Sequence, residues 1–98
     1  MIKVISGVIT FEWDEFNIAH IKRHDVEPQE AEETFFDPLR RILRDELHSE
    51  QEVRYLLIGQ TRAQRHVYIV FTKRASRVRV LQARGMHDKE VKKYEKTA

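Results

Sequence analysis

The stretch HVYIVFTKRASRVRVLQAR, residues 66–84, predicts the centre of the fold. It contains two runs rich in β-branched and aromatic residues, 66–73 and 77–84, which predict β-strands. Only the polar segment RAS separates them, so we expect an antiparallel hairpin. Two more strands are predicted upstream, at 39–45 and 53–60, and the segments HSEQE and TRAQ are expected to form their loops.

The first part of the chain predicts one strand and two helices. VITFEW, residues 8–13, alternates like a strand, and Asp14 is a suitable N-cap for a helix that runs to about His24. Pro28 fits the first turn of a second helix, which the Asp37–Pro38 pair ends. The segment from residue 87 to the end predicts a charged helix with His87 or Asp88 near its cap. The predicted order β-α-α-β-β-β-β-α indicates an α+β fold, with helices packed on a small, mostly antiparallel sheet.

The composition indicates a single globular domain over residues 1–98. The chain contains no cysteine, which excludes disulfides and thiolate metal sites and fits a reducing compartment. Its first residues lack the long apolar run of a signal peptide, and no stretch of 18 apolar residues occurs. We therefore expect a cytoplasmic protein that does not span a membrane.

The charge is distributed unevenly. Residues 1–52 carry 6 Lys+Arg and 13 Asp+Glu, a balance of −7, whereas residues 53–98 carry 12 Lys+Arg and 3 Asp+Glu, a balance of +9. A basic half made mostly of arginine indicates a phosphate-bearing or acidic partner. The alternative is a solvated basic surface that the acidic half offsets.

The segment WDEFNIAHIKRHDV, residues 13–26, has an unusual helical face. At about 100° per residue, one side of the predicted helix combines apolar with polar side chains: Trp13, Phe16 and Ile21 with Asn17, His20 and His24. Two interpretations follow. The polar groups form a hydrogen-bonded seam that docks the helix, or the imidazoles carry protons in a reaction near neutral pH.

Arginines are frequent on the predicted strands. Alternation places Arg77 and Arg79 on one face of their strand and Arg84 on the other, and it places Arg54 opposite Val53 and Tyr55. The planar guanidinium group binds phosphate through two parallel hydrogen bonds and keeps its charge, so these arginines could form a phosphate-binding surface. Alternatively, each arginine covers the sheet with its methylenes and pairs with an acid from the helices.

The motifs argue against a metal site or a bound cofactor. His20 and His24 are four residues apart, but Ile21 follows His20 where the zinc motif H-E-x-x-H has Glu. The chain also lacks a nucleophile elbow, a P-loop and a dinucleotide-binding glycine motif. No cofactor is therefore expected.

Several blocks of the sequence resemble one family, the BrnT toxins of bacterial type II toxin–antitoxin pairs. The blocks are FEWDEFNIAHIKRHDVEPQEAEETFFDPL, HSEQEVRYLLIGQT and VYIVFTKR with RVRVLQARGMHDKEVKKYE. They are similar to the family patterns E-W-D-x-x-N-x-x-H-I-x-x-H-x-V and A-R-x-M-T-x-x-E-x-x-x-Y. The matching positions are Asn17, His20, His24, Arg84, Met86, Glu90 and Tyr94. His87 stands where the family usually has Thr, Asp25 stands where it usually has Gly, and NIAHIKRH resembles an uncharacterised branch.

The resemblance implies a RelE-like fold and an endoribonuclease of the mRNA interferase type that needs no metal. The expected chemistry is attack of a ribose 2′-OH on the adjacent phosphate. The expected catalytic residues are His24, His20, Arg54 and Arg84, and the expected RNA-binding residues are Lys22, Arg23, Arg65, Arg77, Arg79 and Tyr94. Tyr94 would either stack on a base or pack the last helix on the sheet.

The resemblance also implies two partners, an RNA substrate and an antitoxin, BrnA in this family, which binds DNA. The main alternative is a non-catalytic RNA- or protein-binding module with the same fold. A metal-dependent hydrolase is a third and weaker hypothesis.

Overall fold

The computed structural model describes residues 9–45 and 52–96, and it confirms the α+β fold and the predicted order of elements. Part of the predicted first strand (residue 8), part of the predicted HSEQE loop (48–51) and the end of the last helix segment (97–98) lie outside these residues. The elements are β1 (Thr10–Phe11), α1 (Glu15–Lys22), α2 (Pro28–Phe35), β2 (Arg41–Asp45), β3 (Arg54–Gln60), β4 (His66–Arg74), β5 (Arg77–Gly85) and α3 (Asp88–Glu95).

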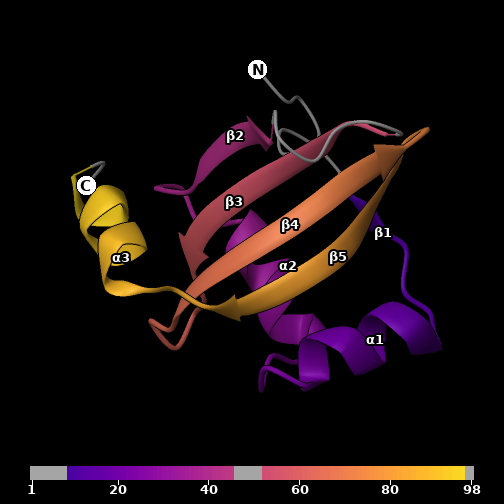
Figure 1. Cartoon of the computed structure of the whole chain (residues 1–98), viewed down its shortest axis with the longest axis horizontal. Coiled ribbons are helices and arrows are strands. Elements are labelled where there is room, and N and C mark those ends of the chain that lie inside the picture. The colour runs from indigo at the N-terminus through magenta and orange to yellow at the C-terminus, as the bar shows by residue number, and fades with distance from the viewer. Residues whose placement is uncertain (1–8, 46–51, 97–98) are drawn as a thin grey trace.

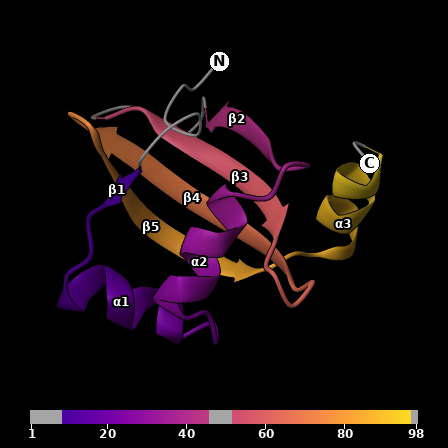
Figure 2. The same ribbon diagram turned by 180° about the vertical axis from the view of Figure 1, so that it is seen from behind.

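The strands form one sheet in the order β1-β5-β4-β3-β2. The hairpin predicted from residues 66–84 is present as the antiparallel pair β4 and β5, and only β1 runs parallel to its neighbour, β5. Figures 1 and 2 show that α2 crosses one face of the sheet. They also show that α3 stands near the point where β3 ends and β4 begins. The opposite face of the sheet is therefore not covered by α2.

The core lies between the sheet and α2. Phe35 of α2 is fully buried, and its ring packs edge-on against Phe71 of β4 and Phe11 of β1, with centroids 4.9 and 5.2 Å apart. Gly59 of β3 lies under α2, where an added Cβ would stand 2.8 Å from Thr34 Cγ2. A glycine at this position therefore lets α2 approach the sheet closely.

The helix ends follow the local sequence. Asp14 caps α1, because its carboxylate accepts hydrogen bonds from the N–H groups of Phe16 and Asn17. At the other end, Asp25 adopts a left-handed φ of 59°, and the N–H of Val26 donates to Ile21 O (3.2 Å). This geometry is a Schellman motif, which explains why the family that the sequence resembles usually has Gly at this position.

The predicted faces of β5 are wrong beyond Val80. A β-bulge shifts the register between β4 and β5, so that Phe71 pairs with Val80 whereas Val70 pairs with Gln82. The extra residue turns the end of β5 over, because each residue reverses the side on which the next side chain lies. Arg84 consequently lies on the same face as Arg79, not on the opposite one.

No helix within residues 9–45 and 52–96 is long and apolar enough to cross a membrane.

Candidate nucleic-acid interface

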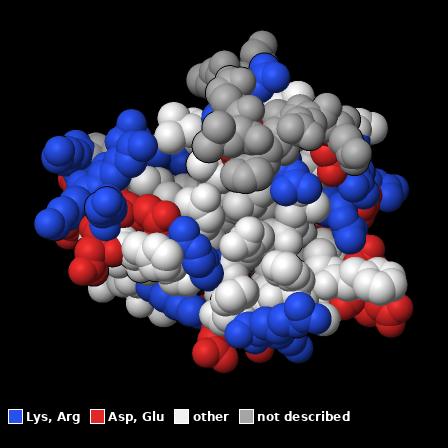
Figure 3. Space-filling model, in the orientation of Figure 1, with Lys and Arg blue, Asp and Glu red and all other residues white. Residues whose placement is uncertain are grey.

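The face of the sheet that α2 leaves uncovered, which we call the open face, carries side chains in cross-strand rows. One row contains Arg54, Thr72 and Arg79, and another contains Ile58, Tyr68 and Arg84. Between them, Leu56, Val70 and Gln82 form a row without charge. Figure 3 shows this side of the molecule, with white side chains through the middle of the view and most of the blue groups to their left, right and below.

Arg84 is held in a fixed position on the open face. Its Nη1 and Nη2 atoms each donate to a carboxylate oxygen of Glu90 at 2.8 Å, and Nη1 also donates to Gly85 O at 3.0 Å. The guanidinium carbon lies 3.9 Å from the centre of the Tyr68 ring, a cation–π arrangement. Within residues 9–45 and 52–96, three of the five guanidinium N–H groups are thus used, and the other two could donate to a phosphate.

The ion pair also changes the protonation of both partners. The hydrogen bonds to Glu90 raise the pKa of Arg84 above its ordinary value. Burial alone would raise the pKa of Glu90, but hydrogen bonds from Arg84 and from the His87 N–H outweigh it and lower that pKa. Both groups are therefore charged across the neutral pH range.

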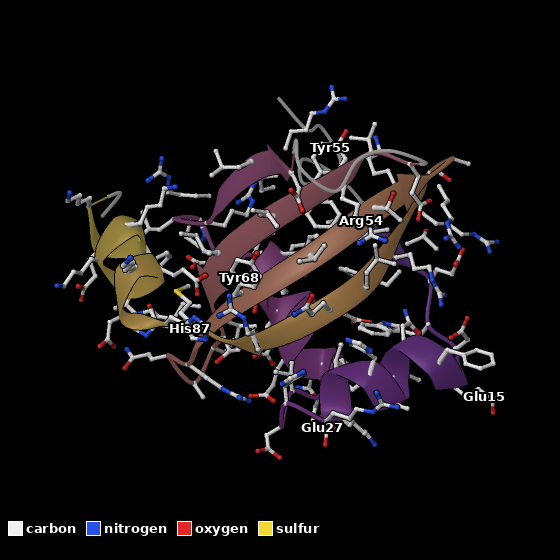
Figure 4. The ribbon with its side chains drawn as sticks, in the orientation of Figure 1. Glu15, Glu27, Arg54, Tyr55, Tyr68 and His87 are labelled. Atoms are coloured by element: carbon white, nitrogen blue, oxygen red, sulfur yellow. The ribbon has the colours of Figure 1, made fainter. Side chains whose placement is uncertain are left out.

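The four residues predicted as catalytic are not gathered at one point. Arg54 is half-buried at the start of β3, four residues along the strands and two strands across from Arg84. At about 3.3 Å per residue and about 4.8 Å per strand, their Cα atoms are on the order of 16 Å apart. Figure 4 shows Arg54 and Tyr68, the neighbour of Arg84, well separated on this face.

His20 on α1 and His24 in the turn after α1 lie on the surface, whereas Asn17, in the first turn of the helix, is buried. The rings of His20 and His24 are 6.2 Å apart and both residues are exposed. Asn17 is 4% exposed; its Nδ2 donates to Glu12 O and Val80 O, and its Oδ1 accepts from the Asp14 N–H. The docking seam of the helix is therefore Asn17 with Ile21, and the imidazoles do not belong to it.

The residues predicted to bind the RNA backbone differ in whether they already form ion pairs with carboxylates of the same chain. Arg79 pairs with Asp14 and Glu12 and has a side chain that is 12% exposed. Arg65 pairs with Glu30 of α2, and Lys22 pairs with Glu27. Arg23 and Arg77 are exposed and have no ion-pair partner among the residues that the structure describes.

Tyr94 is the clearest case of packing. The residue is 4% exposed, and its ring meets that of His66 edge-on, with centroids 5.4 Å apart. Its hydroxyl donates to Asp37 Oδ2 at 2.6 Å, and burial together with this bond raises the pKa of Tyr94 to about 12. The structure therefore shows Tyr94 attaching α3 to the rest of the domain, with no ring face left for a base.

Two residues that surround Arg84 were missing from the predicted site: Tyr68 of β4 and Glu90 of α3. Tyr68 lies two residues after His66 and therefore on the same face of β4 as His66. The contact between Tyr68 and Arg84, however, depends on the bulge. Glu90 matched the resembled pattern, and its position three residues after His87 also completes the capping box of α3. Its bond to Arg84 could not be predicted without the angle between β5 and α3.

Within residues 9–45 and 52–96, no group of three or more His, Asp or Glu side chains is placed to hold a metal ion.

Comparison with known proteins gives one family. The model of the family described as "Ribonuclease toxin, BrnT, of type II toxin-antitoxin system" matches residues 13–90, which include α1, all of β2 to β5 and Glu90. No curated protein matches the chain.

Proposed function

The chain belongs to the BrnT family of type II toxin–antitoxin ribonuclease toxins, and on that premise we propose that it is an endoribonuclease that cleaves without a metal ion. The substrate is RNA, and the attacking group is the 2′-OH next to the scissile phosphate. The 2′-oxygen loses its proton and forms a bond to phosphorus while the bond from phosphorus to the 5′-oxygen breaks. A proton is given to that oxygen, so the products are a 2′,3′-cyclic phosphate and a 5′-OH end.

The observation that carries the proposal is a pair of exposed imidazoles, His20 on α1 and His24 in the turn that follows it. His20 and His24 are 6.2 Å apart, within the part of the chain that the family model matches. An imidazole exchanges protons near neutral pH, and the reaction needs one group to accept a proton and one to donate it. We assign His24 as one proton carrier and His20 as the other.

The position of α1 supports placing the RNA along β5. Figures 1 and 2 both show α1 beside this strand, and the amide of Asn17 donates to the β5 carbonyl of Val80. Arg84 lies on the same strand, where two of its N–H groups could donate to a phosphate. In the proposal Arg84 stabilises the negative charge that develops on the phosphorane, Arg54 binds a more distant phosphate, and Arg23 and Arg77 contact the backbone.

The test is cleavage of single-stranded RNA by purified protein, free of antitoxin, with and without EDTA. We expect cleavage to persist in EDTA and to leave cyclic-phosphate ends. His24→Gln should lower the rate by about 10²-fold or more, with an unchanged circular dichroism spectrum, because His24 is exposed. The matched control is His87→Gln, because His87 is an exposed histidine at the N-cap of α3. This variant should keep the wild-type rate.

Three results would contradict the proposal. Loss of cleavage in EDTA would indicate metal-dependent hydrolysis. An unchanged rate for His24→Gln would remove His24 from the chemistry. RNA binding without any cleavage would favour the non-catalytic module, a function that the pairing of Arg65 and Arg79 with carboxylates also allows.

Membership of the family implies an antitoxin partner. We further propose that this antitoxin is a BrnA-like DNA-binding protein and that the pair acts in the cytoplasm. Co-expression with the product of an adjacent gene, followed by co-purification, tests the partnership.

A further inference from the structure

A groove lies between α3 and the open face of the sheet. Its volume is about 190 Å³, and apolar side chains from the edge strand β2 and its neighbour β3 form its floor: Leu43 of β2 with Leu56 and Ile58 of β3. The ring of Tyr68 forms one side of this floor. Drug-sized ligands occupy cavities of roughly 300–1,000 Å³, so this smaller groove has room for one ring system, with any group attached to the ring lying at its rim.

The aromatic side of the groove is fixed in position. Arg84 covers the Tyr68 ring at 3.9 Å, and Glu90 in turn holds Arg84 through two bonds of 2.8 Å. A ring held in this way loses little conformational freedom when a second flat group packs against it. Aromatic side chains on an open sheet face are the usual platforms for unstacked bases of single-stranded RNA.

The polar groups of the groove complement the remaining parts of a nucleotide. Glu90 faces the groove with its side chain 22% exposed, and its Oε2 accepts one hydrogen bond, from Arg84. A carboxylate oxygen accepts two, so Oε2 is available to an N–H group of a base. Arg41 and Lys93 bring two cations to the same groove, which suits a phosphate.

We propose that this groove binds one nucleobase of the RNA, which packs against Tyr68 and the leucines while Arg41 and Lys93 hold its phosphate. The inference rests on the proposed RNA function and assigns the groove as the base-binding subsite of that function. It also gives Tyr68 and Glu90 a role that does not involve proton transfer. A purely apolar ligand or peptide would make no use of the carboxylate oxygen of Glu90 or of the positive charges of Arg41 and Lys93 that line the groove.

The test is a titration of the ¹⁵N-labelled protein with AMP and, separately, with ribose 5-phosphate, followed by amide NMR. We expect AMP to shift resonances of Leu43, Leu56 and Tyr68 and to bind about 10-fold more tightly than ribose 5-phosphate, because base stacking supplies the difference. Equal affinities would mean that a phosphate alone is bound and would overturn the proposal. Shifts confined to α1 or to Arg77 would also overturn it.

A pair of variants gives an independent test. Leu43 and Leu39 are 42% and 41% exposed, but only Leu43 lies in the groove. Leu43→Glu should weaken AMP binding about 10-fold through repulsion of the phosphate and loss of apolar contact, whereas Leu39→Glu should leave it unchanged. Equal effects of both changes, or an effect of Leu43→Glu on antitoxin binding with none on AMP, would overturn the base-binding role.

The two proposals can fail separately. If RNA cleavage persists in EDTA while AMP shifts no resonance of the groove, the base-binding role of the groove is wrong and the proposal of a metal-independent ribonuclease is supported. If AMP binds in the groove while RNA is never cleaved, the base-binding role of the groove is supported and the proposal of a ribonuclease is wrong.

Discussion

Replacing Asn17 tests how α1 is attached to the sheet. The side chain is 4% exposed, and its amide joins three backbone groups: the carbonyls of Glu12 and Val80 and the N–H of Asp14, at 2.8 to 3.1 Å. The bond to Val80 is important because, among the described residues, β1 pairs with β5 at Arg77 and Val78, so the amide occupies the strand edge beyond that pairing. Asn17→Ala removes all three bonds.

The expected loss of stability can be worked out from these contacts. A hydrogen bond contributes about 1 kcal/mol net, and a buried carbonyl left without a partner costs about as much again. Water can replace the partner of the partly buried groups near Glu12 and Asp14 but not that of the Val80 carbonyl, so we expect about 2–3 kcal/mol. For a domain of this size that loss lowers Tm by roughly 10–20 °C.

The assay is urea and thermal unfolding followed by circular dichroism. His20→Ala is the matched control, since His20 lies on the same helix and is exposed, and its replacement should change the unfolding free energy by less than about 0.5 kcal/mol. If Asn17→Ala costs less than about 0.5 kcal/mol, or if His20→Ala costs as much as Asn17→Ala, the assignment of the seam is refuted.

Three further changes follow from individual contacts. Arg84→Lys should slow RNA cleavage by about 10-fold or more, because lysine lacks the planar fork that contacts both Glu90 and a phosphate; a wild-type rate would exclude Arg84 from the site. Asp25→Gly should raise the unfolding free energy by about 0.5–1 kcal/mol, because φ is 59° there; a destabilised variant would show that the aspartate side chain has a role of its own. Tyr94→Phe should cost about 1 kcal/mol at pH 8 by removing the bond to Asp37. Since folding raises the pKa of Tyr94 from 10.0 to about 12, this tyrosine stabilises the fold fully below pH 10 and loses that contribution as the pH rises through 12. Urea unfolding across that range should therefore show the difference between wild type and Tyr94→Phe shrinking, and a constant difference would contradict the assignment.

The sequence predicts most of the elements because their signals are local. The cap at Asp14, the proline at the start of α2 and the short polar loop before Arg77 each act within a few residues, and the structure confirms each of them. The face of Arg84 could not be predicted in the same way, because a bulge depends on how β4 and β5 pair. One extra residue in the pairing was enough to bring Arg84 onto the face of Arg79 and beside Tyr68.

The sequence also did not show which residues of α1 face the sheet, because this depends on how the helix packs against β5. Periodicity at 100° per residue groups Phe16 with Ile21, yet Phe16 is 73% exposed and Ile21 is fully buried. The helix contacts the domain through a narrow strip, since it covers only the edge of β5 and not the middle of the sheet. Of the polar residues, only Asn17 falls within that strip, and this leaves the two imidazoles in solvent.

The uneven charge of the two halves has an internal explanation as well as an external one. Several ion pairs of the described residues join an arginine of the basic half to an acid of the acidic half: Arg65 to Glu30, Arg74 to Glu12 and Glu52, and Arg79 to Glu12 and Asp14. Exposed pairs such as those of Arg74 contribute little to stability individually, but all of these pairs neutralise arginines that would otherwise be available to RNA. The net charge of the basic half therefore overstates how many phosphates it can bind. On this argument, recognition of RNA depends less on general attraction to the sheet than on a few placed groups: the fixed Arg84, the imidazoles of His20 and His24, and the groove beside α3.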